Sequence, residues 1–293
     1  MTRKFFVVAN PASGRQKIGK MLRNLTDFFE QKECSYKLFE TSFEKRGHHT
    51  VEENLTEEYT DLVVVGGDGS IHEAVNGLKH DVPVSFLPAG TGDDFIKNFT
   101  IGNSIREQLE TILEGKEKVI DLGLCNEKKF VNGVGVGFDG QIVADMAKKD
   151  IRFLSGHAKY YYHVLAILSS YGDKTFSYQM EGETFERQNI AMTIANGTTF
   201  GGGFKLTPKA RIDDGFLDVC EIGPISPVKR YLNINRLQSG SHGVLKAVRF
   251  YSIKEIRIEE NPLLEAHIDG ELLGNPPFDI KVLPDALTIR IKN

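Results

Sequence analysis

Hydrophobic residues follow two different spacings in the first 115 residues of the chain. Short runs rich in apolar residues predict four strands, at Phe5–Ala9, Tyr36–Glu40, Leu62–Val65 and Val84–Leu87. Between these runs, apolar residues recur at helical intervals, most clearly across residues 17–32. Further helices are expected at Gly47–Leu55, Ile71–Leu78, Asp93–Asn98 and Ile105–Leu113. Strands that alternate with helices predict parallel βαβ units, with helices on both faces of the sheet.

The pattern changes near residue 118, where shorter strands separated by turn dipeptides predominate. The predicted strands are Val119–Leu124, Lys129–Val136, Thr175–Met180, Asn189–Asn196, Phe216–Glu221, Val248–Phe250, Glu255–Glu259, Ala266–Ile268, Ile280–Val282 and Leu287–Ile291, with helices at Asp139–Lys149 and His157–Ser170. The fold class is therefore α/β, with a doubly wound parallel-sheet domain followed by a β-rich, sandwich-like domain. We expect the first domain to span residues 1–120, completed by a strand at 286–293, and the second to span 121–285.

Composition limits the classes of protein that fit. The 293 residues are 40% hydrophobic and 26% charged, which indicates a folded chain, and the net charge of −4 argues against a nucleic-acid partner. Three widely spaced cysteines form neither a disulfide framework nor a zinc motif. The apolar run at Phe5–Ala9 is too short for a secretion signal, and no stretch reaches the roughly 20 apolar residues of a membrane span. A cytoplasmic location is expected.

The segment Gly66–Ser70 follows the third predicted strand and has features of a phosphate-binding loop. Glycines let backbone N–H groups approach a phosphate, and a helix that starts directly afterwards adds its positive end. Asp68 supplies a carboxylate suited to Mg²⁺. Ser70 as N-cap with Glu73 three residues later fits a capping box, so a simple capped turn is the alternative interpretation.

Two further polar loops follow the first and fourth strands, at Asn10–Gly14 and Gly90–Asp94. Because ligands bind at the carboxyl ends of parallel strands, these loops and Gly66–Ser70 are expected to share one edge of the sheet. Neither a Walker A motif nor a dinucleotide-binding fingerprint is present, since the glycines of Gly133–Gly137 have the wrong spacing and lie outside the early βαβ units.

The combination of motifs resembles the diacylglycerol kinase catalytic domain family, in particular its bacterial soluble lipid kinases, which also resemble sphingosine kinases. The resemblance spans nearly the whole chain, in the order of the family. It implies a first domain like those of NAD kinases and diacylglycerol kinases. The motifs that carry it are Asn10-Pro11-x-Ser13-Gly14, Gly66-Gly67-Asp68-Gly69-Ser70-x-x-Glu73-x-x-Asn76-Gly77, Pro88-x-Gly90-Thr91-x-x-Asp94-Phe95, Asp121-Leu122-Gly123, Phe130-x-Asn132, Gly201-Gly202-Gly203, Asp213-Asp214-Gly215-x-Leu217-Asp218 and Asp269-Gly270-Glu271.

The resemblance implies functional roles at matching positions. Glu271 is the implied general base with Asp269 beside it, while Asp68 and Asp94 organise the catalytic Mg²⁺. A second, structural Mg²⁺ site is implied at the Asp214 carboxylate and the backbone carbonyls of Arg211 and Phe216. The implied ATP-binding residues are Asn10, Pro11, Ala12, Ser13, Gly14, Thr41, Gly67, Asp68, Gly69, Ser70, Ile71, His72, Glu73 and Thr91. From the residues alone, Asp269-Gly270 also fits a two-residue hairpin turn.

Two positions depart from the family pattern. Ser70 stands where the family usually has Thr, and Asp93 stands where it usually has Asn. Ser70 keeps the hydroxyl group, whereas Asp93 adds a negative charge that either repels ATP or strengthens metal binding.

The function expected from the resemblance is an ATP- and Mg²⁺-dependent lipid kinase that phosphorylates the hydroxyl of diacylglycerol or a related lipid. The expected partners are a lipid at a membrane surface, contacted peripherally, and a second copy of the chain in a homodimer. An NAD kinase-like phosphotransferase and an inactive nucleotide- or lipid-binding regulator are the alternatives.

Two groups of residues are candidates for lipid contact. Two basic clusters could dock anionic headgroups. Their members are Arg15, Lys17 and Lys20 in the first, and Lys148, Lys149, Arg152 and Lys159 in the second. The aromatic segment His157–Tyr171, together with Phe153 and Leu154, could line an acyl-chain pocket, although such segments are more often plain core.

Overall fold

The chain folds into two compact units, residues 1–120 with 285–293, and residues 121–284. The structure is a computed structural model that describes residues 3–11, 15–41, 47–148 and 156–293. The expected fold class is confirmed, with a parallel sheet in the first unit and a β sandwich in the second.

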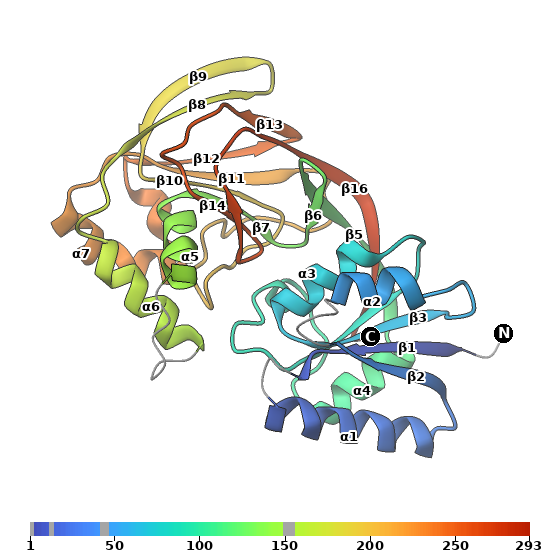
Figure 1. Ribbon diagram of the computed structural model, residues 1–293. Coiled ribbons are helices and arrows are strands. Elements are labelled where there is room, and N and C mark those ends of the chain that lie inside the picture. The colour runs from blue at the N-terminus through green and yellow to red at the C-terminus, as the bar shows by residue number, and fades with distance from the viewer. Residues whose placement is uncertain (1–2, 12–14, 42–46, 149–155) are drawn as a thin grey trace. The chain divides into compact units, whose positions relative to one another are not determined.

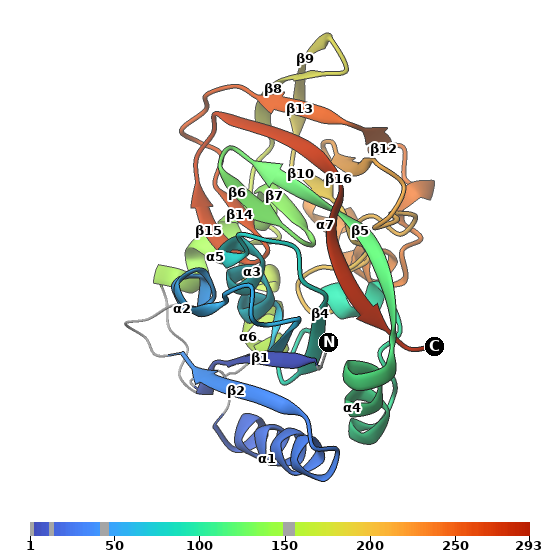
Figure 2. The same cartoon turned by 90° about the vertical axis from the view of Figure 1, so that its right-hand side faces the viewer.

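The first unit is a parallel sheet covered by helices on both faces (Figure 1). Its strands lie in the order β2-β1-β3-β4, and the end of β16 pairs with β4 through Ile289 and Val84. Helices α1 and α4 cover one face, and α2 and α3 cover the other, as Figure 2 also shows. Its elements are β1 (Lys4–Ala9), α1 (Arg15–Gln31), β2 (Ser35–Glu40), α2 (Gly47–Asn54), β3 (Asp61–Gly66), α3 (Asp68–Gly77), β4 (Val84–Pro88), the 3₁₀ helix η2 (Phe95–Asn98) and α4 (Ile105–Glu114).

Strands β1, β3 and β4 are buried on both faces, which explains their unbroken apolar runs. Phe5, Val7 and Ala9 face the α1 side and pack with Val63 and Leu87. The strand order reverses direction between β1 and β3, because the chain passes from β1 to β2 on one side and continues from β3 to β4 on the other. Such a switch point is where open α/β sheets bind their ligands.

The second unit contains two sheets that pack face to face. One sheet has the order β12-β11-β10-β7-β14-β15, and the other contains β16-β13-β8-β9 together with β5 and β6. The elements that follow α4 are β5 (Lys116–Cys125), β6 (Lys128–Phe130), β7 (Gly133–Gly137), α5 (Phe138–Lys148), α6 (Gly156–Ile167), β8 (Lys174–Met180), β9 (Glu183–Asn189), β10 (Ala191–Ala195), β11 (Leu217–Ile222), α7 (Pro227–Ser239), the 3₁₀ helix η3 (His242–Val244), β12 (Val248–Ile253), β13 (Glu255–Ile258), β14 (Ala266–Ile268), β15 (Glu271–Gly274) and β16 (Phe278–Ile291).

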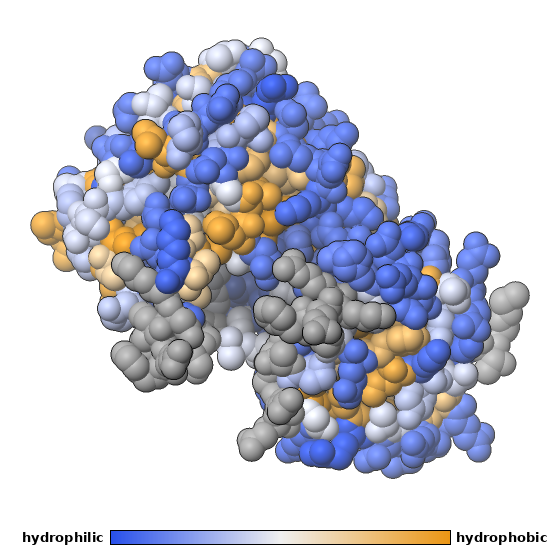
Figure 3. All heavy atoms as spheres, in the orientation of Figure 1, coloured by the Kyte–Doolittle hydropathy of each residue, from blue (hydrophilic) through white to orange (hydrophobic). Residues whose placement is uncertain are grey.

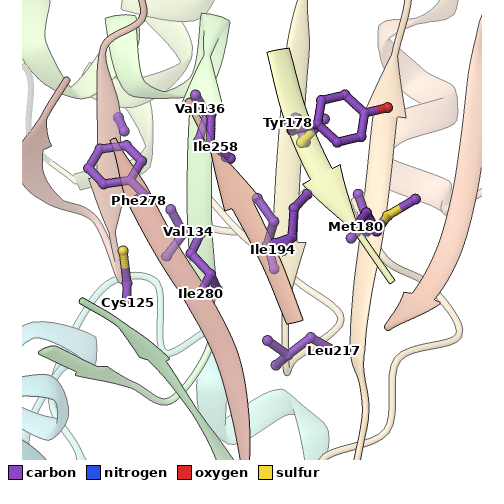
Figure 4. Close-up of a cluster of buried hydrophobic side chains, with 14 of the residues drawn as sticks. Cys125, Val134, Val136, Tyr178, Met180, Ile194, Leu217, Ile258, Phe278 and Ile280 are labelled. Atoms are coloured by element: carbon purple, nitrogen blue, oxygen red, sulfur yellow. The ribbon is translucent and has the colours of Figure 1, made fainter. Parts of the chain in front are cut away.

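The core of the second unit lies between these sheets, as Figure 4 shows. Val134 and Val136 of β7 and Ile194 of β10 meet Phe278 and Ile280 of β16. A second apolar cluster, which includes Ile142, Val164 and Ile234, lies where α5, α6 and α7 cover the first of the two sheets.

Several predicted elements differ from the structure. The sequence pattern predicts no helix at α7, because apolar residues lie on both of its sides, with Val228 and Leu232 exposed and Ile234 buried. Residues 129–136 form two strands, β6 and β7, with a break at Val131–Asn132. The strands predicted at Ile280–Val282 and Leu287–Ile291 are one strand, β16.

The buried carboxylate of Asp61 ties the chain terminus into the first unit. Its oxygens contact Nε of Arg3 at 2.9 Å and Nε of Arg290 at 2.8 Å, while Thr60 donates a further hydrogen bond at 2.7 Å. Arg290 also donates to the carbonyl of Gly115. The residues after 284 therefore belong to this unit through charged hydrogen bonds as well as strand pairing.

Asp61→Asn is expected to lower the free energy of unfolding by about 3–5 kcal/mol, because two guanidinium groups lose a buried partner. Chemical denaturation would measure the change. The control Glu58→Gln breaks the exposed pair with Lys4 and should leave the midpoint nearly unchanged. Equal effects of the two variants would contradict the role given to Asp61.

Candidate active site

The predicted phosphate loop lies at the switch point of the first unit, between β3 and α3. Helix α3 begins at Asp68, and Gly67 is its N-cap, without a side-chain cap. The first N–H groups of the helix therefore have no partner within it and form a positive end suited to an anion. Ile71 makes the first helical bond, to the carbonyl of Gly67.

The capping box predicted for Ser70 and Glu73 is wrong. Ser70 lies inside the helix, and its hydroxyl packs where a Cβ at Gly66 would stand. Glu73 accepts a hydrogen bond from the backbone N–H of Gly47 at 2.8 Å instead. A capping box does occur at the start of α4, where Ser104 and Glu107 bond reciprocally.

Two glycines let the loops after β3 and β4 approach each other closely. A Cβ on Gly90 would stand 2.8 Å from the Cα of Gly67 and 2.5 Å from Oδ1 of Asp93. The backbone N–H of Ala89 donates to the carbonyl of Gly66 at 2.9 Å. No side chain larger than hydrogen fits between these backbones without displacing one of them.

This close approach places the Asp68 carboxylate on the backbone of the next loop. Its oxygens accept hydrogen bonds from the N–H groups of Asp94 at 3.0 Å and Phe95 at 3.1 Å. Burial raises the pKa of Asp68 to about 6, against the lowering effect of these bonds, and the charges of Asp94 and Asp93 add to the rise. The site therefore concentrates negative charge that a cation would neutralise.

The neighbouring acids have different partners. Asp94 is buried and accepts a hydrogen bond from Lys97 Nζ at 2.6 Å. Asp93 has a left-handed backbone, with φ of 49°, and its Oδ1 is buried without a hydrogen-bond partner among the described residues. Burial raises the pKa of Asp93, while the charge of Lys17 opposes this rise.

These donors fit the predicted Mg²⁺ in chemical type. Carboxylates are the side-chain ligands that Mg²⁺ prefers, and each bonded oxygen of Asp68 keeps a second lone pair. The unpartnered Oδ1 of Asp93 is a further acceptor. It matches the expectation that the added charge strengthens metal binding rather than the one that it repels ATP, and both stay predictions. Within the described ranges, no group of three or more His, Cys, Asp or Glu side chains is placed to hold a metal directly. A mainly water-mediated contact is what these residues allow.

Other predicted ATP-binding residues lie at the ends of the same parallel strands. Asn10 and Pro11 follow β1, and the buried Thr41 follows β2, with its hydroxyl lacking a hydrogen-bond partner within the described part of the chain. Thr91 is exposed in the loop after β4. Ala12, Ser13 and Gly14 lie outside the described residues. The remaining predicted positions, Gly67, Gly69, Ile71 and His72, are the N-cap and the first two turns of α3.

Lys17 is a residue of this site that the sequence prediction assigned only to a basic cluster. Its Nζ donates a hydrogen bond to the carbonyl of Gly90 at 2.9 Å, and its charge acts on Asp93. No spacing rule links position 17 to position 90, so only the folded chain reveals it.

The predicted base lies in the second unit, on a two-residue hairpin turn. Ile268 pairs with Glu271, and Asp269 and Gly270 have φ angles of 48° and 87°, which are the values of a type I′ turn. The carboxylate of Asp269 accepts three backbone hydrogen bonds, from Val131, Asn132 and Gly133, each at 2.9 Å. Asp269 thus anchors the turn, and Glu271 beside it is exposed.

Three polar side chains, His267, Asp139 and Tyr160, form a connected group that supports the same turn. The imidazole of His267 accepts a hydrogen bond from the N–H of Gly270 at 3.2 Å through Nδ1, and its Nε2 lies 3.0 Å from Oδ2 of Asp139. Tyr160 donates to the other oxygen of Asp139 at 2.8 Å. Burial would raise the pKa of Asp139, but His267 and the Tyr160 hydrogen bond outweigh it and lower that pKa. Sequence reasoning missed this group, although His267 stands two residues before Asp269.

The second predicted metal site lies in the turn before β11. Asp214 accepts a hydrogen bond from the N–H of Phe216 at 3.2 Å, and the buried Asp121 accepts one from Gly215 at 2.7 Å. One carboxylate with the carbonyls of Arg211 and Phe216 is a donor set of the kind that hard cations take. The occupancy of this site stays a prediction.

An apolar pocket lies inside the second unit, between β10 and the helices that cover it. Its volume is about 100 Å³, and its lining is almost entirely hydrophobic. The polar side chains at its wall include Asp139, Tyr160 and Arg230. Tyr160, Val164 and Leu168 lie within the segment predicted as an acyl-pocket candidate, whereas Phe153 and Leu154 lie outside the described residues.

The combination of a phosphate-type helix end, a carboxylate cluster and a β-sandwich second unit defines a kinase of the NAD kinase and diacylglycerol kinase fold class. Residues 4–125 match the family model described as diacylglycerol kinase catalytic domain, and residues 132–291 match that of the YegS C-terminal NAD kinase beta sandwich-like domain. The chain belongs to this lipid kinase family, with both of its domains.

Similar proteins support the assignment along the whole chain. A "Probable lipid kinase YegS-like" from Shewanella frigidimarina is 30% identical over 77% of this chain and 74% of its own. The diacylglycerol kinase of Bacillus subtilis is 24% identical over 92% of this chain and 90% of its own.

Two solved structures share the fold. The crystal structure of a diacylglycerol kinase from Bacillus anthracis has a TM-score of 0.74 at 22% identity, and covers 99% of this chain and 97% of its own. An NAD kinase from Archaeoglobus fulgidus in complex with ATP has a TM-score of 0.54 at 13% identity, and covers 98% and 93% of the two chains. Among the described residues, the helices are all too short or too polar to cross a membrane.

Gly90→Ala is expected to lower the free energy of unfolding by about 1–3 kcal/mol, because the new methyl group overpacks two backbones. Thermal or chemical denaturation would report the loss. Gly172→Ala is the matched control, since a Cβ there meets nothing within 4 Å. If both variants were equally stable, the loops would be less tightly apposed than we conclude.

Proposed function

We propose that the protein is an ATP- and Mg²⁺-dependent lipid kinase that phosphorylates the hydroxyl of diacylglycerol or a related lipid. The observation that carries this proposal is the Asp68 carboxylate, held at the positive end of α3 by two N–H groups of the next loop. The family membership of both domains supports the kinase assignment. The apolar pocket in the second unit supports a lipid acceptor rather than a polar one.

Phosphoryl transfer needs positioning and charge neutralisation more than covalent chemistry. The free N–H groups at the start of α3 bind phosphate oxygens of ATP, and Thr41 and Asn10 offer further polar contacts at the same sheet edge. When bound with ATP, Mg²⁺ supplies positive charge to the β- and γ-phosphates. Asp68, Asp94 and Asp93 would hold the ion mainly through water, and Lys97 keeps Asp94 in place.

In the transfer step, the acceptor oxygen forms a bond to the γ-phosphorus while the bond from that phosphorus to the bridging oxygen of ADP breaks. The hydroxyl proton passes to a carboxylate. Glu271 is the better candidate for this base, because it is exposed, whereas the Asp269 carboxylate already accepts hydrogen bonds from three backbone N–H groups. Asp269, with His267 and Asp139 behind the turn, then positions Glu271. Contact with a membrane surface and a homodimer stay predictions of this proposal.

The decisive experiment is incubation with γ-labelled ATP, Mg²⁺ and total lipid extract, followed by identification of the labelled product. We expect label in a phosphorylated diacylglycerol or a related lipid, and loss of transfer in Asp68→Ala with the fold retained. Label in NADP, in a parallel incubation with NAD as the acceptor, would favour the NAD kinase alternative, and ATP binding without any transfer would favour the regulator. Near-normal turnover of Asp68→Ala would refute the role of that carboxylate.

The raised pKa of Asp68 predicts an acid limb in the pH dependence of kcat/KM. Because Asp68 must be ionised to hold the cation and has a pKa of about 6, kcat/KM should rise tenfold per pH unit below pH 6 and level off above it. Steady-state assays from pH 5 to pH 8 at fixed ionic strength would test this. The variant Glu271→Gln is the comparison: its kcat/KM should be lower at every pH but should still fall below pH 6. A flat profile through pH 5 in the unmodified enzyme would contradict the prediction.

A further inference from the structure

Helix α7 presents apolar residues to solvent as well as to the core. Val228 and Leu232, one helical turn apart, are 70% and 74% exposed. The opposite side of the helix faces inward, where Arg230, Ile234 and Leu237 line the apolar pocket. Burial of the inward side already holds the helix on the unit, so the outward apolar side is not needed for folding.

More exposed apolar side chains lie on neighbouring elements of the same unit. Val244 of η3 is 70% exposed, and Phe250 of β12 packs beside η3, with its ring 5.3 Å from that of His242. Tyr231 donates a hydrogen bond to the carbonyl of Leu165, which is itself exposed and joins α6 to the group. In Figure 3 hydrophobic atoms are visible where α6 and α7 lie. We call this set of exposed residues on α6, α7, η3 and β12 the α7 face.

The charge of the α7 face has one sign. Residues 223–254 contain six Lys and Arg residues and no Asp or Glu. The whole chain has a net charge of −4, so the residues outside this segment have a net charge of −10. The segment is therefore positive while the rest of the protein is acidic. Lys229, Arg236 and Lys246 are exposed and have no acidic partner among the described residues. By contrast, Arg230 and Arg249 are engaged with Asp173 and Glu221.

Exposed apolar side chains flanked by unpaired cations match an anionic lipid surface. Apolar residues enter the boundary between headgroups and acyl chains, while Lys and Arg reach the phosphates. A second copy of this face is a poor partner, because two identical positive surfaces repel each other in a two-fold arrangement. Charge therefore selects a membrane over a homodimer as the occupant.

We propose that the α7 face docks the protein on anionic membranes, through Val228, Leu232 and Val244 with Lys229, Arg236 and Lys246. The pocket lies directly behind this face and shares its helices. At about 100 Å³ it is smaller than the roughly 150 Å³ cavity that holds a benzene ring, so an acyl chain needs α6 or α7 to move outward. If these helices contact the membrane, their outward movement occurs next to the lipid that would enter the pocket. The entry of an acyl chain rests on the proposed function, whereas docking on the membrane does not.

The absence of tryptophan from the chain allows a direct test. In Leu232→Trp the single indole should shift its emission to shorter wavelength on addition of vesicles of phosphatidylcholine and phosphatidylglycerol, but not of phosphatidylcholine alone. Leu263→Trp is the matched reporter, at an exposed leucine elsewhere in the same unit, and should not shift. An unchanged Leu232→Trp spectrum, or an equal shift of both reporters, would overturn the proposal.

Sedimentation with the same vesicles tests the charges. K229Q/R236Q/K246Q should lower the partition coefficient by about 100-fold, because each Lys or Arg near an anionic surface contributes roughly a factor of five. K20Q/R23Q/K128Q has the same net charge and removes exposed cations outside the α7 face, including one from the first predicted basic cluster. Equal losses in the two triple variants would refute the assignment. Unchanged melting temperatures would show that all variants remain folded.

Two readouts separate this inference from its alternatives. V228E/L232E should lose turnover on acceptor lipid in vesicles while keeping it on a monomeric short-chain acceptor, which leaves the kinase site itself untouched. If no lipid is phosphorylated at all, the proposed function fails, but the vesicle results still decide docking. Conversion of a dimer to a monomer by V228E/L232E, with vesicle binding unchanged, would identify the face as a protein interface and overturn the proposal.

Discussion

The candidate site depends on one steric constraint, the contact between two backbones at Gly67 and Gly90. Only hydrogen atoms separate the loops there, and the hydrogen bond from Ala89 to Gly66 keeps them together. This proximity brings the N–H groups of Asp94 and Phe95 within reach of the Asp68 carboxylate. The glycines that first suggested a phosphate cradle therefore have a second role, which is to join two loops into one polar surface.

The same surface is acidic, and its acidity has a consequence for binding. Burial and the charge of Asp94 raise the pKa of both Asp68 and Asp93, while Lys17 and Lys97 oppose the rise at Asp93. A divalent cation would lower the repulsion between these carboxylates. It would also give the buried Oδ1 of Asp93 a partner. Asp93, which departs from the family pattern, therefore adds an acceptor oxygen of the type that Mg²⁺ prefers.

In the second unit, a few buried side chains hold the hairpin turn at Asp269 and Gly270. Asp269 accepts three backbone N–H groups, and His267 accepts one from Gly270, so the turn is held from both sides. Gly135 leaves the space in which His267 and Asp139 meet, since a Cβ there would lie within 2.5 Å of both side chains. The simple hairpin interpretation and the catalytic one are therefore compatible, because the turn is what presents Glu271.

The sequence by itself determined the alternation of strands and helices, the class of the fold, and the loops that follow β1, β3 and β4. These features depend on local spacing of apolar residues and on glycine, both of which act over a few positions. Tertiary structure alone decided that Ser70 is not an N-cap, that Lys17 reaches Gly90, and that α7 has exposed apolar residues on its outward side. Each of these outcomes depends on which surfaces and backbone groups meet between residues far apart in the chain, and no local pattern carries that information.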